Sequence, residues 1–283
     1  MRIEGKIAVI VGAGQSPGEG MGNGRATALR FAREGAKLLA LDRNLESAEQ
    51  TAAMVRDEGG ECVAFDADVT DEATLAEAMS FAVDRWGRID ILHNNVGVSI
   101  AGGDASPLEI TEEAFDRICA INLRGTVMAC KHALPIMRKQ RSGAIVNISS
   151  IAAWASYPLV AYKATKAGMI AYTQQIAIQN ASFGVRANVI LPGLMDTPMA
   201  VDTRARATGK SRAEVLCFQD CPISLRSMPN RSSSKVLEKR CIIHNIGSFD
   251  GCAICRSSDR QKAGYGISAY CPDRTLSRSR FRR

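Results

Sequence analysis

The stretch Ile7-Ala8-Val9-Ile10-Val11-Gly12-Ala13-Gly14 decides the fold of this chain. Its first five residues are apolar and mostly β-branched, which is the pattern of a short strand buried on both faces. The glycines that follow open a glycine-rich segment that continues to Gly24, where a helix is predicted to begin. A buried strand, a glycine-rich turn and a helix in this order indicate the first unit of a parallel α/β sheet.

The same pattern repeats outward from this stretch. Five further apolar runs resemble the first and are predicted to be strands: 37–41, 62–65, 89–92, 144–148 and 186–191. Between them lie segments with the three- and four-residue apolar spacing of helices: 24–34, 45–58, 70–86, 112–138 and 162–183. This alternation predicts a doubly wound α/β fold, with a parallel sheet covered by helices on both faces. Ligands of such folds bind beyond the carboxyl ends of the strands.

Composition divides the chain into two regions. It has 283 residues, of which 46% are hydrophobic, enough for one large core. Its net charge of +7 lies entirely in residues 213–283, which carry 13 basic and 6 acidic residues and also six of the nine cysteines. We therefore predict one domain over 1–212, followed by a Cys-, Ser- and Arg-rich segment over 213–283, in which no strand or long helix is expected beyond Val215.

The sequence contains no sign of a membrane or nucleic-acid partner. No apolar run approaches the ~20 residues of a membrane span, and the N-terminus lacks a signal-type hydrophobic region, so we expect a soluble, cytoplasmic protein. The Arg-Ser residues at 274–283 lack aromatic residues that would stack on bases, and a solvated tail is the simpler interpretation.

The glycine-rich segment is a candidate dinucleotide site. Glycines at a strand-to-helix turn let backbone N–H groups approach a diphosphate, which the helix N-terminus also attracts. The alternative is a flexible loop without a ligand. Asp42 ends the second strand, where a carboxylate accepts hydrogen bonds from the ribose hydroxyls and repels a 2′-phosphate, which favours NAD over NADP. Arg43 offers a partner for such a phosphate, and Asp42 alone is also consistent with a helix cap.

Tyr162 and Lys166 stand four residues apart on a predicted helix, so both side chains project from one face. A nearby ammonium, with the positive charge of an oxidised nicotinamide, is expected to lower the tyrosine pKa and make the phenol a general base. The alternative is an ordinary helix with an exposed lysine and a packed tyrosine.

Residues 8–193 resemble the short-chain dehydrogenase/reductase family in motif order and spacing. The resemblance rests on these matches: Gly12…Gly22-x-Gly24, Asp68-Val69, Asn94-Asn95-Val96-Gly97, Asn122, Ser149-Ser150, Tyr162-x-x-x-Lys166 and Pro192-Gly193. It implies a Rossmann-type fold, a nicotinamide cofactor and a Ser-Tyr-Lys-Asn active site. The implied reaction is hydride transfer between NAD(H) and a secondary alcohol or ketone.

The resemblance also implies a role for each matched residue. Tyr162 exchanges the proton, Lys166 tunes it and holds the nicotinamide ribose, Ser150 bonds the substrate oxygen, and Asn122 positions a water that links Lys166 to solvent. Asp68 and Val69 contact the adenine, Asn94 and Gly97 support the cofactor wall, and Thr197 reaches the carboxamide. The full set expected to bind the cofactor is Gly12, Gly22, Asn23, Gly24, Asp42, Arg43, Asp68, Val69, Asn94, Gly97, Tyr162, Lys166, Pro192, Gly193 and Thr197.

Three departures affect the site. The glycine loop carries extra residues, including Pro17, Gly18 and Glu19, and Val96 replaces the family's usual alanine. Ser150 lies twelve positions before Tyr162, one fewer than usual, which leaves Ser149 as an alternative catalytic serine.

The loops expected to contact the substrate are mostly apolar and predict a hydrophobic or cyclic alcohol, although ordinary packing explains the same residues: Val98, Ser99, Ile151, Trp154, Leu194 and Met195. The resemblance also implies a homotetramer or homodimer formed through the helices at 112–138 and 162–183.

The C-terminal segment does not match the family, whose last buried strand has no counterpart here. Our leading hypothesis is a shifted reading frame or divergent splice from about Leu216. In that case the chain would bind nucleotide but be catalytically impaired. A zinc module of Cys241, His244, Cys252 and Cys255 is a weaker alternative because only seven residues separate the two pairs, so we expect no metal.

Overall fold

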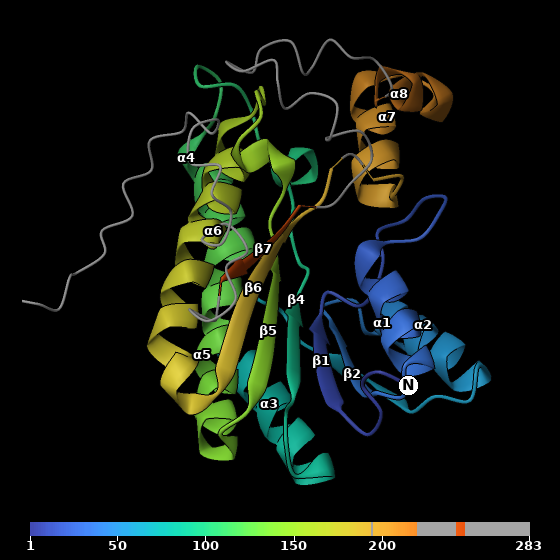
Figure 1. The fold of residues 1–283 in the computed structure, drawn as a ribbon. Coiled ribbons are helices and arrows are strands. Elements are labelled where there is room, and N and C mark those ends of the chain that lie inside the picture. The colour runs from blue at the N-terminus through green and yellow to red at the C-terminus, as the bar shows by residue number, and fades with distance from the viewer. Residues whose placement is uncertain (194, 220–241, 247–283) are drawn as a thin grey trace, which may run out of the picture. The chain divides into compact units, whose positions relative to one another are not determined.

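The computed structural model describes residues 1–193, 195–219 and 242–246, which form a seven-stranded sheet with helices on both faces (Figure 1). The strand order is β3-β2-β1-β4-β5-β6-β7. The strands are β1 (Ile7–Val11), β2 (Lys37–Asp42), β3 (Cys62–Asp66), β4 (Ile91–Asn94), β5 (Gly143–Ile148), β6 (Val185–Leu191) and β7 (Ile242–Ile246). The predicted strand at 89–92 begins two residues later, at Ile91.

The first six strands are parallel, which confirms the predicted doubly wound, Rossmann-type sheet. β1 lies between β2 and β4, so the chain runs outward in one direction through β3 and in the other from β4. The strand order therefore reverses between β1 and β4, where Val11 pairs with Asn94. Ligands of open α/β sheets bind beyond the strand ends at such a reversal.

The helices form two layers (Figure 1). One layer is α1 (Asn23–Arg33) with α2 (Leu45–Asp57), and the other contains α3 (Glu72–Trp86), α5 (Gly125–Gln140) and α6 (Val160–Asn180). The remaining α-helices are α4 (Glu112–Cys119), α7 (Thr203–Thr208) and α8 (Arg212–Gln219). None of the helices in the described part of the chain is both long and apolar enough to cross a membrane.

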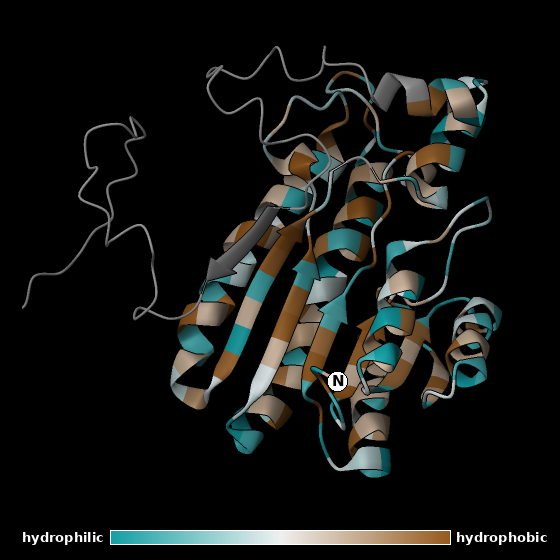
Figure 2. Cartoon of the chain, turned by 45° about the vertical axis from the view of Figure 1, so that its right-hand side comes forward, coloured by the Kyte–Doolittle hydropathy of each residue, from teal (hydrophilic) through white to brown (hydrophobic). Residues whose placement is uncertain are grey.

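β1 is hydrophobic along its whole length because each of its sides faces a helix layer, whereas polar residues interrupt other strands of the sheet (Figure 2). In β1, Val9 packs in the core shared with α3 and α5, while its neighbour Ile10 packs in the core shared with α1 and α2. Both side chains are fully buried. This explains why the strand is a continuous apolar run rather than an alternating one.

β7 corrects the prediction that no strand follows Val215. It pairs antiparallel with β6, with Ile242 opposite Leu191 and Ile246 opposite Ala187. The sequence criterion was a continuous apolar run, which suits a parallel strand buried on both faces. An antiparallel strand at the edge of a sheet needs apolar residues on only one of its faces, so the presence of polar residues does not exclude it.

The rest of the expected C-terminal segment lies outside the described residues, as do Leu194 and the proposed zinc ligands Cys241, Cys252 and Cys255. Among the described residues, no helix packs on the α1–α2 side of β5 and β6. Three apolar side chains on that side, Val146, Ile148 and Ile190, are only partly buried.

Candidate active site

Two glycines allow the glycine loop to cross the end of β1. A Cβ atom at Gly24 would lie 1.9 Å from the carbonyl oxygen of Gly12, and one at Gly12 would lie 2.7 Å from Val96 Cγ2. Gly12 also has a φ of +83°, which glycine adopts without strain. Asn95 Nδ2 donates to the same Gly12 oxygen at 3.1 Å. These contacts hold the start of α1 directly against the strand end.

The N-terminus of α1 is suited to an anion. Its cap residue is Gly22, which has no side chain to accept from the first backbone N–H groups of the helix. The first backbone N–H groups of a helix carry a partial positive charge and need partners, so they form an anion site. Gln15 shapes the loop in front of them, because its side chain accepts from Gly22 N at 2.9 Å and donates to Gly20 O at 3.2 Å. Gly12, Gly22, Asn23 and Gly24 therefore lie together where the end of β1 meets the start of α1.

Asp42 lies at the carboxyl end of β2 and faces the glycine loop. Its Oδ2 accepts from Gly14 N at 3.0 Å and its Oδ1 from Asn44 N at 3.0 Å. The cap of α2 is Asn44, whose side chain accepts from Ser47 N, so Asp42 is not the helix cap. Arg43, the next residue, is exposed. Asp42 thus joins the end of β2 to the glycine loop.

The predicted cofactor-binding residues after β3 and β4 contact different parts of the protein. Asp68 Oδ1 accepts from the backbone and side chain of Thr70, and Val69 is buried against Gly125. Asn94 is buried and donates to Asn147 Oδ1 at 2.8 Å, so it joins β4 to β5, with one oxygen left unpaired. Asn95 reaches the glycine loop instead, a role that its place in the sequence motif does not reveal.

Asn122 lies at a π-helical turn (Ala120–Arg124) between α4 and α5, so the predicted helix at 112–138 is interrupted there. Its side chain is fully buried and exchanges two hydrogen bonds with the backbone of Val98, at 2.7 and 2.8 Å. It also donates to Thr165 Oγ1 at 3.2 Å. Asn122 therefore ties the loop after β4 to α6, which carries Tyr162 and Lys166.

Lys166 is buried, at 2% exposure, rather than exposed as in the ordinary-helix alternative. Its Nζ donates to the carbonyl oxygen of Ile148 at 2.8 Å and lies 5.6 Å from the ring centre of Tyr162. Gly97 leaves room for it, because a Cβ atom there would lie 3.1 Å from Nζ. Tyr162 and Lys166 are therefore brought together at the carboxyl end of β5.

The two candidate serines point to different partners. Ser149 is buried and donates to the backbone oxygen of Lys166 at 2.7 Å, which holds α6 to β5. Ser150 Oγ accepts from Ala152 N at 3.1 Å, and Ser150 acts on Tyr162 by lowering the pKa of its phenol. The geometry therefore favours Ser150 over Ser149 as the serine that acts with the tyrosine.

Burial opposes the expected lowering of the tyrosine pKa. It raises the pKa of Tyr162 above its usual value, while Ser150 and the positive charge of Arg204 partly offset this. Burial also lowers the pKa of Lys166 to about 8, because its ammonium has lost water. Sequence spacing placed the two groups together but could not weigh desolvation against charge.

Asp104 is a positioning residue that the sequence patterns do not reveal. The N-cap residue of α6, Leu159, has no side chain that can accept from the first backbone N–H groups of the helix. The carboxylate of Asp104 accepts from them instead. It accepts from Ala161 N and Tyr162 N, each at 2.9 Å, and faces Ser99 Oγ at 3.3 Å. It lies 58 residues from Tyr162, so no local pattern indicates the contact.

The loop after β6 brings in the remaining predicted residues. Thr197 is buried, and its Oγ1 accepts from Ala200 N at 3.3 Å. The backbone oxygen of Pro192 accepts from Ile151 N at 3.1 Å, and a Cβ atom at Gly193 would lie 4.0 Å from the Ile151 side chain. Of the expected substrate contacts, Trp154 and Met195 are 52% and 40% exposed.

A family model described as short chain dehydrogenase matches residues 6–208. This chain belongs to that family. Its members are oxidoreductases that act on CH–OH groups with NAD or NADP. Sorbitol dehydrogenase from Cereibacter sphaeroides is 39% identical over 199 residues, covering 69% of this chain and 73% of that protein.

Solved structures agree with this assignment. The crystal structure of levodione reductase superposes with a TM-score of 0.72 at 32% identity, covering 79% of this chain and 85% of that one. A 7α-hydroxysteroid dehydrogenase complexed with NADH and 7-oxo glycochenodeoxycholic acid has a TM-score of 0.65 at 28% identity, covering 72% of this chain and 75% of that one.

Lys166 gives a testable pH dependence. Its pKa is about 8 in the folded protein against 10.5 for an unperturbed lysine, so between these values the unfolded chain binds more protons and stability rises with pH. From pH 7.5 to 10 the wild type should gain about 2 kcal/mol relative to Lys166→Met. Urea unfolding of both proteins across this range measures the gain. Parallel stability curves would contradict the burial of a charged lysine.

Proposed function

We propose that this protein transfers a hydride between NAD(H) and a secondary alcohol or its ketone. The observation that carries the proposal is the buried ammonium of Lys166, which lies 5.6 Å from the ring centre of Tyr162, with Ser150 acting on the same tyrosine. This group lies at the carboxyl edge of the sheet, the same edge as the glycine loop. Membership of the short chain dehydrogenase family supports the same conclusion.

The described residues fit a dinucleotide. The uncapped start of α1 at Gly22 suits the diphosphate, and the absence of side chains at Gly12 and Gly24 leaves the backbone accessible. Asp68 and Val69 would face the adenine, Thr197 the carboxamide, and Pro192 and Gly193 the adjoining wall. When bound, the nicotinamide supplies the acceptor for the hydride of the carbinol carbon, or its donor in the reverse direction.

The protein groups act on the substrate oxygen. Ser150 donates a hydrogen bond to it, and during oxidation the hydroxyl proton of the substrate passes to the oxygen of Tyr162. Lys166 stabilises the tyrosine phenolate that accepts this proton and holds the nicotinamide ribose, and a water held near Asn122 returns the proton to solvent. Because burial disfavours the phenolate, the positive charges of Lys166 and of the oxidised cofactor must supply its stabilisation.

Three finer assignments belong to this proposal. Asp42 favours NAD, since its carboxylate would repel the 2′-phosphate of NADP. The exposed apolar surfaces of Trp154 and Met195 favour a hydrophobic or cyclic substrate. Pairing of α5 and α6 between copies would give a homodimer or homotetramer. A cytoplasmic location remains a prediction.

One observation favours a second candidate, a nucleotide-binding protein with impaired catalysis. The partly buried side chains Val146, Ile148 and Ile190 lie on a face of β5–β6 that no described helix covers. Such a surface lowers the stability of the strand end that carries Ser150. Binding of NADH without oxidation of any alcohol would select this candidate.

Replacing Tyr162 with Phe tests the reaction. The change removes the proton acceptor and should lower kcat by about 10²–10⁴-fold, with the dissociation constant of NADH nearly unchanged. The assay is NAD reduction against a panel of cyclic and linear secondary alcohols. Tyr172→Phe, on the same helix, is the matched control and should keep wild-type kcat. A Tyr162→Phe enzyme with wild-type turnover would overturn the mechanism.

Replacing Asp42 with Ala tests the cofactor preference. The wild type should use NAD with the higher kcat/KM, and Asp42→Ala should raise kcat/KM for NADP at least about tenfold by removing a carboxylate near the 2′-phosphate. Asp57→Ala removes an exposed carboxylate at the C-terminal end of α2 and serves as the control. An unchanged ratio of the two cofactors in Asp42→Ala would show that Asp42 does not face the ribose.

A further inference from the structure

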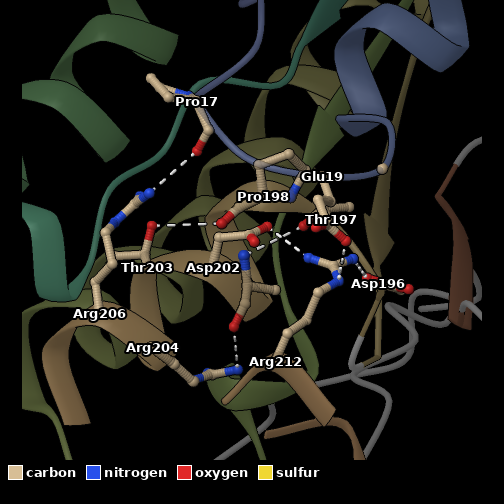
Figure 3. A network of polar contacts seen from close by, with 12 residues as sticks. Pro17, Glu19, Asp196, Thr197, Pro198, Asp202, Thr203, Arg204, Arg206 and Arg212 are labelled. Atoms are coloured by element: carbon tan, nitrogen blue, oxygen red, sulfur yellow. Dashed lines mark hydrogen bonds and ion pairs between the residues drawn. The ribbon is translucent and has the colours of Figure 1, made fainter. Parts of the chain in front are cut away.

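The extra residues of the glycine loop have partners in the segment after β6 (Figure 3). Arg212, the first residue of α8, contacts three carboxylates. Its side chain is 21% exposed and lies 2.6 Å from Asp202 Oδ2, against Asp196, and 3.6 Å from Glu19 Oε2 in the glycine loop. Arg206 adds a hydrogen bond to the backbone oxygen of Pro17 at 3.4 Å.

Close packing of the loop backbone against the side chains of Asp202 and Arg212 joins the same two segments. A Cβ atom at Gly18 would lie 2.6 Å from Asp202 Oδ2, and Gly18 has a φ of +148°. A Cβ atom at Gly20, whose φ is +82°, would lie 3.4 Å from the Arg212 guanidinium. The loop therefore approaches the ion cluster so closely that glycine is required at position 18.

The contacts of Arg212 are unequal. Glu19 is 83% exposed, and an exposed ion pair contributes only about 0–1 kcal/mol. Asp202 is 15% exposed and receives a short, direct hydrogen bond. The main effect of Arg212 is therefore to fix the positions of Asp202 and Asp196. The backbone of Gly18 packs against Asp202, and Asp196 directly precedes Thr197.

The position of this cluster links two parts of the cofactor site. The glycine loop leads into Gly22 at the start of α1, where the diphosphate is expected. Thr197, expected at the carboxamide, follows Asp196 in the chain and caps the turn that leads to Asp202. A ligand that spans both parts binds more tightly when their separation is already fixed.

We propose that Arg212 is a positioning residue of the cofactor site, which holds the extended glycine loop against the Asp196–Asp202 segment before the dinucleotide binds. The proposal rests on the proposed function for the identity of the ligand. The contact between the two segments is independent of the proposed function.

Arg212→Gln in the full chain tests the proposal by two readouts. Without cofactor, backbone hydrogen exchange of residues 15–22 and 196–206 should be faster than in the wild type, because the loop and the segment separate. With cofactor, the KM for NAD and the dissociation constant of NADH should each rise about tenfold, while kcat changes less than about twofold. Arg33→Gln, which breaks an exposed ion pair with Glu58 between α1 and α2, is the matched control and should change neither.

Two further variants separate positioning from general stability. Gly18→Ala should raise KM for NAD as Arg212→Gln does, and the double variant should show less than the sum of the two free-energy effects, because both disturb one contact. Arg212→Lys keeps a charge and should recover part of the affinity. Strictly additive free-energy effects in the double variant, or no recovery of affinity in Arg212→Lys, would refute the contact that the two residues share.

The outcomes also distinguish the two proposals. If the wild type binds no NADH or NADPH, the proposed function fails, and the exchange rates still decide whether Arg212 holds the loop. If exchange in residues 15–22 is the same in Arg212→Gln and the wild type, the positioning role is refuted even when the enzyme is active.

Discussion

The close crossing of the Gly12 carbonyl and Gly24 is the constraint on which the rest of the site depends. With 1.9 Å between that oxygen and the position of a Gly24 Cβ atom, any side chain would push α1 away from the end of β1. The crossing places the uncapped N-terminus of α1 at the reversal of strand order between β1 and β4. Asn95 holds the Gly12 oxygen from the β4 side, so the ends of β1 and β4 together fix the glycine loop.

The second half of the site is built around buried polar groups. Lys166 gives up hydration to reach the Ile148 oxygen, which lowers its pKa to about 8. Asp104 and Ser149 then hold the backbone of α6 near Tyr162 and Lys166, and Asn122 holds the helix to the loop after β4. These bonds come from separate parts of the chain and converge on one turn of α6. Such a turn is rigid enough to keep the tyrosine beside Ser150.

The sequence predicted the parallel strands and the glycine-rich turn from β1 into α1 because both follow from local patterns of apolar residues and glycine. It also placed Tyr162 and Lys166 on one helix face, since four-residue spacing fixes that geometry. It missed Asp104 and the Arg212 cluster, whose contacts join residues far apart in the chain. It missed β7 because an antiparallel edge strand lacks a continuous apolar run, and it could not include the effect of burial on the Tyr162 pKa, because desolvation depends on the three-dimensional structure.

The central claim is that a dinucleotide binds across the carboxyl edge, from the start of α1 to Tyr162. A crystal structure of the protein with NADH tests it most directly. The account predicts the diphosphate at the backbone N–H groups of Gly22–Gly24, a ribose hydroxyl on Asp42, and the nicotinamide facing Tyr162. NADH bound elsewhere, or bound here with the nicotinamide turned away from Tyr162, would contradict it.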